Sequence, residues 1–193
     1  MSVEAYSRRA DIKELCNDLF APIEDYTRII DIDANNDSAY ENRGSLKICI
    51  DDISGAIEDY SKAIEINPKN FVAISSLGCA KEKMGLYQEA IEEYTKAIEF
   101  GRVCDYCSRA QVKVKINDLD GAIQDYQAYL KTIEKDGDKD FYFFELAKIY
   151  FDRKEYEQAL EYTNKAIDLS IPTNMSELKN KIISALDLNN NGV

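Results

Sequence analysis

The chain has 193 residues, of which 45% are apolar and 31% are charged, and its formal net charge is −12. The apolar share is enough for a continuous core, but no apolar run approaches the roughly 20 residues that cross a bilayer. An acidic protein repels nucleic acid and anionic membrane surfaces, so we expect neither of them as a partner.

The chain contains five cysteines and no histidine. The odd number of cysteines, together with an N-terminus that lacks the apolar core of a secretion signal, favours reduced thiols and a cytoplasmic location. The lack of histidine removes the usual neutral-pH general base and the usual zinc-binding imidazole. No nucleophile–base pair or phosphate loop stands out either. We therefore predict a protein that is not an enzyme and that holds no cofactor or metal.

A 34-residue pattern organises the chain, and residues 37–70 carry its most regular copy. Residues recur there at helical spacing in two groups, which are Tyr40, Arg43, Gly44 and Lys47 and then Ala56, Tyr60 and Ala63. This spacing predicts two amphipathic helices joined by a short turn and closed by Pro68. Such a unit has too little apolar surface to fold alone, so the pattern predicts a stack of copies.

In chain order, the copies cover about 3–36, 37–70, 71–102, 103–136 and 140–173, and an amphipathic capping helix follows at about 175–188. A final helix that covers the open end is typical of stacked repeats. One equivalent position in the turn of each copy is held by Asn17, Asp51, Gly85, Asn117 and Lys154. Four of these five are residue types that tolerate positive φ. Gly101 is expected to end the third copy as a left-handed helix stop.

The copies depart from regularity in or next to the fourth one. Two residues are deleted before Tyr106, Tyr129 stands where other copies have a small residue, and a charged insertion precedes Phe141. We expect the stack to be regular as far as Gly101 and distorted beyond it, with any specific site near the distortion.

These residues resemble the tetratricopeptide repeat. The third copy matches that family's pattern closely at Ile74, Leu77, Gly78, Ala90, Tyr94 and Ala97. The resemblance implies one all-α domain over 1–193, a right-handed superhelical α-solenoid of antiparallel helix pairs whose first helices line a concave groove. The copies differ from the family at basic residues, with Arg at 9, 43 and 109 and Lys at 13, 47, 81 and 113. These side chains are expected to extend along apolar surface or to meet acidic residues of neighbouring helices.

The resemblance further implies a protein–protein interaction scaffold that binds a peptide or helix of a partner protein in the groove. The candidate groove residues are Ser7, Asp11, Asn42, Ser45, Ser75, Cys79, Cys107, Ser108, Gln111, Phe141, Phe144 and Lys148. Short neutral side chains in this set leave room for a peptide backbone, although a solvated surface would tolerate them equally well. A clamp for chaperone C-termini is disfavoured, because Asp11 would repel the carboxylate.

The fifth copy concentrates aromatic residues. Phe143 is expected in the core, and Phe141 and Phe144 cannot both share its face, so at least one of them is a candidate exposed anchor. Packing of these rings against the insertion or the final helix is an equal alternative.

Two other functions stay open from the sequence. The first is a thiol-based metal or redox role centred on Cys79, Cys104 and Cys107, against which we favour cysteines that act as small side chains. The second is self-association of a structural module.

Overall fold

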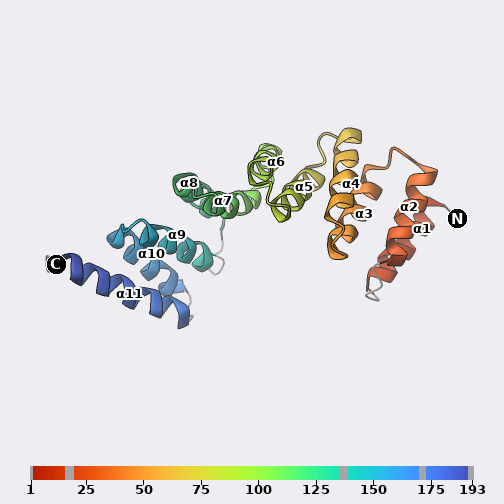
Figure 1. Ribbon diagram of the computed structural model, residues 1–193. Helices are drawn as coiled ribbons and strands as arrows, with labels where there is room; N and C mark the ends of the chain where they lie inside the picture. Colours follow the sequence, from red (N-terminus) through yellow and green to blue (C-terminus); the bar gives the residue numbers. More distant parts are fainter. Residues whose placement is uncertain (1, 16–19, 135–138, 170–172, 191–193) are drawn as a thin grey trace. The chain divides into compact units, whose positions relative to one another are not determined.

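The structure is a computed structural model that describes residues 2–15, 20–134, 139–169 and 173–190, and in these ranges the chain is entirely α-helical (Figure 1). The described helices are α1 (Val3–Leu15), α2 (Phe20–Ile32), α3 (Asp37–Cys49), α4 (Ile53–Ile66), α5 (Phe71–Lys83), α6 (Tyr87–Glu99), α7 (Asp105–Lys115), α8 (Leu119–Leu130), α9 (Asp140–Asp152), α10 (Tyr156–Leu169) and α11 (Thr173–Asn190). The all-helical fold predicted from the sequence is thereby confirmed. None of the helices described is both long enough and apolar enough to cross a membrane.

The helices fall into two compact units, Met1–Val112 and Lys113–Val193. The first unit holds α1 to α6 and most of α7, and the second holds α8 to α11. The single domain expected over 1–193 stays a prediction.

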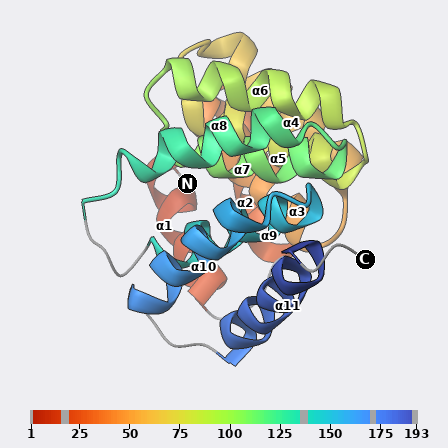
Figure 2. The ribbon, with the colours of Figure 1, turned by 90° about the vertical axis from the view of Figure 1, so that its left-hand side faces the viewer.

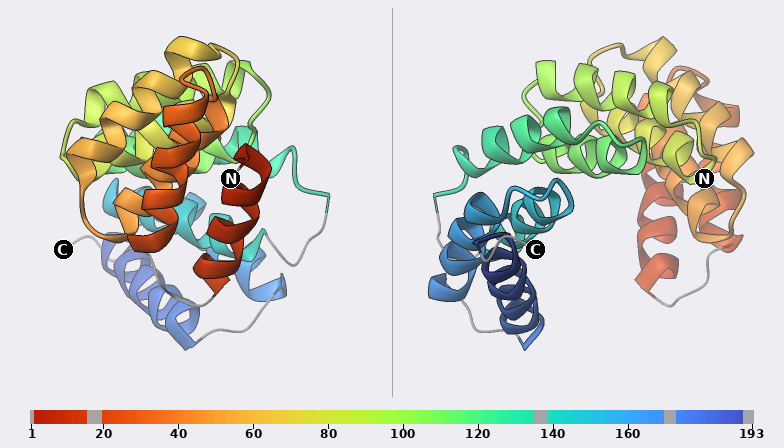
Figure 3. Two further views of the ribbon diagram at one scale, coloured as in Figure 1. Left: turned by 90° about the vertical axis from the view of Figure 1, so that its right-hand side faces the viewer. Right: turned by 60° about the vertical axis from the view of Figure 1, so that its left-hand side comes forward.

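In the first unit, α1 pairs with α2, α3 with α4 and α5 with α6, and successive pairs stack through contacts between α2 and α3 and between α4 and α5 (Figure 3). Within the second and third pairs, a glycine of the first helix lies against a tyrosine ring of the second. A Cβ atom added at Gly44 would lie 2.9 Å from Cε1 of Tyr60, and one at Gly78 would lie 3.0 Å from Cε1 of Tyr94. The glycines of the repeated pattern therefore make room for the buried rings.

The turns inside the helix pairs take up the backbone conformation expected from their residues. Positive φ occurs at Asp51 (64°), Gly85 (77°), Asn117 (62°) and Lys154 (63°), and Gly101 ends the third copy with φ of 91°. These expectations are confirmed, and Asn17 lies outside the described residues. Lys154 adopts this conformation although a lysine is disfavoured there.

Several helices begin at a side chain that accepts a hydrogen bond from the first turn. The caps Asn36, Asp52, Asn70 and Asp118 accept from the backbone N–H three residues on, at 3.0 to 3.1 Å. Such caps satisfy donors that the helix itself leaves without a partner.

In the second unit, α9 pairs with α10, and α11 packs on both (Figure 2). Met175 and Ile182 of α11 are buried. Ile183 is exposed, so the buried stripe of this helix is narrower than the sequence pattern indicates. A helix thus occupies the place of the capping helix expected at about 175–188.

Candidate functional site

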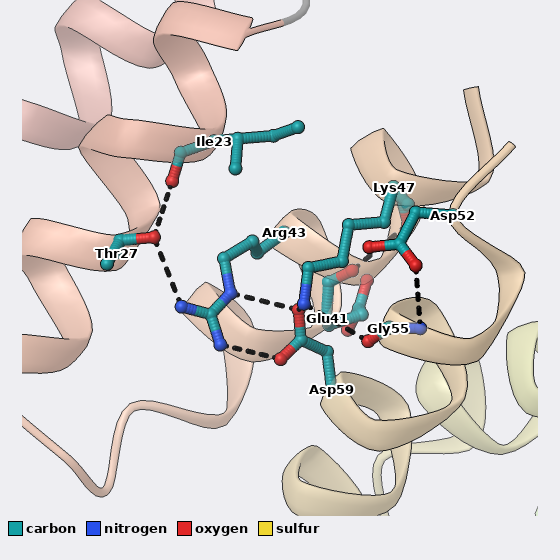
Figure 4. Close-up of polar contacts among 9 residues, drawn as sticks. Ile23, Thr27, Glu41, Arg43, Lys47, Asp52, Gly55 and Asp59 are labelled. Atoms are coloured by element: carbon teal, nitrogen blue, oxygen red, sulfur yellow. Dashed lines mark hydrogen bonds and ion pairs between the residues drawn. The ribbon is translucent and has the colours of Figure 1, made fainter. Parts of the chain in front are cut away.

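Basic residues that depart from the family pattern form ionic clusters around buried carboxylates, and Figure 4 shows the cluster of the second copy. Arg43 donates from Nε and Nη2 to the two carboxylate oxygens of Asp59, at 2.9 and 2.6 Å. Lys47 Nζ lies 2.8 Å from Asp59 Oδ2, and Arg43 Nη1 donates to Thr27 Oγ1 of the preceding pair at 3.1 Å. The hydrogen bonds to Asp59 raise the pKa of Arg43. Arg43 of α3 therefore links α2, through Thr27, to the buried carboxylate of Asp59 in α4.

The same arrangement recurs with changes along the chain. Arg9 pairs with Asp25, Lys113 Nζ lies 2.8 Å from Asp125, and Arg109 donates to Thr95 at 2.8 Å. The prediction that these basic residues meet acidic residues of neighbouring helices is confirmed for Arg9 and Lys113. The side chain of Lys13 lies outside the described residues.

In the third copy, Leu77 replaces the arginine and the longer Glu93 replaces the aspartate. Lys81 Nζ lies 2.9 Å from Glu93. Burial disfavours the charge of Glu93, but the hydrogen bonds from Lys81 and Lys96 outweigh it and lower the pKa of this carboxyl. The buried charges of the described clusters are thus neutralised inside the protein.

In the fifth copy the ionic cluster is replaced by aromatic rings. Tyr150 stacks on Tyr162 with ring centroids 5.4 Å apart and planes 7° from parallel. Gln127, at the position of Thr27 and Thr95, donates to the Tyr162 hydroxyl at 3.3 Å. The joint loss of Arg and Lys at these positions, where Leu146 and Tyr150 stand, is the signal of this exchange in the sequence.

The candidate groove residues of the first unit lie mostly at the surface of the first helices. Ser45, Cys79 and Gln111 are exposed, whereas Ser7, Asn42, Cys107 and Ser108 are half-buried. The Asp11 side chain lies outside the described residues. Ser75 is the exception, because it is buried and donates to Asp105 Oδ1 at 2.8 Å. It therefore offers no group to a ligand.

Where one helix pair meets the next, three junctions with equivalent positions differ in what fills them. We define them as the first junction (α1 and α2 with α3), the second (α3 and α4 with α5) and the third (α5 and α6 with α7). At the second, the Asn70 amide donates to Asp37 Oδ2 and to Glu41 Oε2, both at 3.0 Å. The junction is thus closed by the chain's own carboxylates.

At the third junction a buried carboxylate takes the place of an alanine. Asp105 is at the position of Ala39 and Ala73, and its burial raises its pKa. Arg102 Nε lies 3.3 Å from Asp105 Oδ2, but the two atoms are too poorly aligned for a hydrogen bond.

At the first junction, Val3 and Ser7 stand where the second has Asp37 and Glu41, and a cavity of about 60 Å³ remains. It is lined by Val3, Ser7, Tyr26, Ile29, Asn36, Ser38, Ala39 and Asn42. Two candidate groove residues, Ser7 and Asn42, are thereby brought to one cavity.

In the second unit, the candidate residues lie on α9 among aromatic rings. Phe141 is 47% exposed and packs edge-on against Tyr142, whose ring also meets Tyr129 edge-on at 4.9 Å. Phe144 is half-buried, and Lys148 Nζ lies 5.5 Å from the centre of its ring.

The structure also places the ring that was expected in the core. Phe143 lies beside Tyr162 and is only half-buried, so the expectation that it is a core residue is wrong. Leu146 and Ala147 are the fully buried residues of α9.

The cysteines behind the redox alternative lie at or near the surface. Cys79 and Cys104 are exposed and Cys107 is half-buried. Cys104 Sγ lies 4.0 Å from Asp105 Oδ1. Within the described ranges, no three or more His, Cys, Asp or Glu side chains are grouped so that they could hold a metal ion.

Comparison with known proteins agrees with this architecture. Two family models, both described as the tetratricopeptide repeat, match residues 37–70 and 142–170 and residues 60–92. No curated protein sequence matches significantly.

Solved structures show the same fold at low identity. The MamA protein is 22% identical over 86% of this chain and 91% of its own, with a TM-score of 0.78. MamA 41-end from Desulfovibrio magneticus RS-1 is 14% identical over 86% and 94%, with a TM-score of 0.78. YrrB, described as a TPR protein with an unusual peptide-binding site, is 20% identical over 91% and 90%, with a TM-score of 0.75. The chain therefore contains tetratricopeptide repeats, which the family models match at residues 37–92 and 142–170, and it shares the fold of these solved structures.

Proposed function

We propose that this protein is a non-enzymatic scaffold that binds a peptide or helix segment of a partner protein along the exposed face of its first helices. The tetratricopeptide fold supports a protein–protein interaction scaffold, and proteins built from it are generally not enzymes. The peptide-binding site named for YrrB supports a peptide as the ligand. The cytoplasmic location expected from the sequence belongs to the same proposal.

The observation that carries the proposal is the contrast between buried and exposed polar groups. The described ionic clusters pair their charges internally, as Asp59 does with Arg43 and Lys47. The exposed face of the first helices instead carries neutral side chains such as Ser45, Cys79 and Gln111. Short side chains let a peptide backbone approach closely, and carboxamides and hydroxyls bond its N–H and C=O groups.

The chemistry at the third junction is consistent with a scaffold. Ser75 and Asp105 form a hydroxyl–carboxylate pair, but both are buried. The hydroxyl is therefore withdrawn from any substrate at the surface.

In the second unit, we propose Phe141 and Phe144 as aromatic anchors for a partner segment. Exposed aromatic rings are enriched among the residues that contribute most to binding. Phe144→Ala is expected to weaken binding while leaving the helical content unchanged, because its ring is only half-buried. Loss of the fold in this variant would instead make Phe144 a core residue.

To test the groove, peptides that bind the full-length protein are selected from a random library, and their affinities for variants of the protein are measured. We expect Cys79→Arg, on the exposed face of α5, to weaken the selected peptides about tenfold or more, because the long side chain blocks the backbone's approach. The matched control is Gln88→Arg, which adds the same charge at an exposed position of α6. Equal effects of the two variants, or failure to select any peptide, would overturn the proposal.

A further inference from the structure

The cavity at the first junction has the size and lining of a subsite for one small polar side chain. Its 60 Å³ leave room for about four waters, or for the head of one side chain. Val3, Ile29 and Ala39 contribute apolar walls. The hydrogen-bonding groups come from α1 and α3 and are Ser7, Asn36, Ser38 and Asn42.

One donor at this cavity has no partner. Asn36 Oδ1 accepts from the backbone N–H of Ala39 at 3.0 Å and so caps α3. Its amide Nδ2 has no hydrogen-bond partner in the part of the chain that is described. The side chains of Ser7 and Asn42 likewise form no hydrogen bond with described residues. The cavity therefore presents the Asn36 amide donor, the Asn42 carboxamide and the hydroxyls of Ser7 and Ser38 to a ligand.

The second junction shows what such an amide binds. Asn70 caps α5 as Asn36 caps α3, and its Nδ2 donates to Asp37 and Glu41 of the preceding pair. At the first junction these carboxylates are replaced by Val3 and Ser7, which do not bond Asn36. An oxygen acceptor supplied from outside would complete the same arrangement.

The lining of the cavity selects a neutral acceptor. None of the lining residues is charged, so the cavity supplies no cation to pair with a carboxylate. A carboxylate would lose hydration there without an ion pair to offset the loss. A carboxamide is neutral, its C=O can accept from Asn36, and its NH₂ can donate to a serine hydroxyl.

We infer that the cavity at the first junction binds the carboxamide side chain of an Asn or Gln in a partner segment. This inference rests on the proposed function and deepens it, because it names a residue that the bound segment carries. The cavity formed by α1, α2 and α3 would then select partner segments that carry an Asn or Gln at the matching position.

The inference is tested on the full-length protein with three probes, the N-acetyl N′-methylamides of asparagine, aspartate and leucine. Binding is followed by NMR through the side-chain amide resonances of Asn36 and Asn42. We expect saturable shifts with the asparagine probe and an affinity about fivefold or more above those of the aspartate and leucine probes, which corresponds to one hydrogen bond. Preference for aspartate or leucine, or no binding of the asparagine probe, would overturn the inference.

Two variants locate the binding. The double variant Val3→Asp/Ser7→Glu copies the second junction and is expected to reduce binding of the asparagine probe about tenfold, because its own carboxylates engage Asn36. Asn36→Asp keeps the capping oxygen but removes the donor, and it should reduce binding similarly. Thermal unfolding of both variants verifies that they fold. Unchanged binding in a folded variant contradicts the inference.

The outcome is separable from that of the proposed function. If library-selected peptides bind along the first helices but the asparagine probe does not bind, the inference fails and the scaffold stands. If neither binds, both fail.

Discussion

The second and fifth copies fill the same positions between their helices with different contacts, an ionic cluster in the second and an aromatic pair in the fifth. In the second, Arg43 and Lys47 of α3 pair with the buried carboxylate of Asp59 in α4, and Arg43 also donates to Thr27 of α2. In the fifth, Tyr150 and Tyr162 fill the same positions with stacked rings and one hydrogen bond from Gln127. Ionic clusters lose far more when one member is removed, because the remaining charge is left buried, whereas an aromatic pair loses only its own contacts.

Removal of the buried carboxylate should have the largest effect. Asp59→Ala leaves Arg43 and Lys47 beside an apolar core without their partner, and we expect a loss of about 3 to 5 kcal/mol in the free energy of unfolding. Urea denaturation followed by circular dichroism measures this loss. A loss below about 1 kcal/mol would show that water replaces the carboxylate at little cost.

The matching change in the fifth copy should cost less. Tyr162→Phe keeps the ring stacked on Tyr150 but removes the acceptor of the Gln127 amide, so we expect a loss of about 1 kcal/mol. The same denaturation experiment applies. A loss as large as that of Asp59→Ala would contradict the claim that the ionic cluster is more sensitive than the aromatic pair to the loss of one member.

The turns offer a pair of opposite changes. Lys154 holds positive φ at a cost that glycine does not have, so Lys154→Gly should stabilise the protein by about 0.5 to 1 kcal/mol. Gly85→Ala should destabilise it by a similar amount, and no atom crowds a Cβ there, so the effect reports backbone conformation alone. Thermal unfolding of both variants measures the two shifts, and shifts of the same sign would contradict this explanation.

The smallest expected effect is a dependence on pH. The pKa of Glu93 is lowered by Lys81 and Lys96 against the opposing effect of burial, so the folded state holds its proton less tightly than the unfolded state does. The stability that Glu93 contributes is therefore present above the ordinary value of 4.5 and is lost as the pH falls through the lower folded value. The difference in unfolding free energy between wild type and Glu93→Gln should shrink on acidification. A constant difference would show that Glu93 keeps an ordinary pKa.

Much of the fold could be predicted because its signals are local. Helical spacing and turn residues such as Gly85 and Asn117 act within a few residues of themselves, and the structure follows them. The candidate site was less accessible to prediction. Ser75 stands at the position of Glu41, which is only half-buried, but Ser75 is buried and donates a hydrogen bond to Asp105 of the next pair.

The sequence by itself determined the helices, their pairing and the turns, since periodicity and backbone preference are properties of neighbouring residues. It left two outcomes open for Arg43 and Lys47, extension along apolar surface or pairing with an acid. Only the tertiary structure shows that both side chains pair with an acid, which is Asp59. It likewise decided that the second junction is closed and the first is open, because Asn36 and Asn70 are equivalent caps whose difference comes from side chains some thirty residues away on a packed neighbour. Contacts across stacked pairs depend on both partners at once, and no single copy of the repeat contains them.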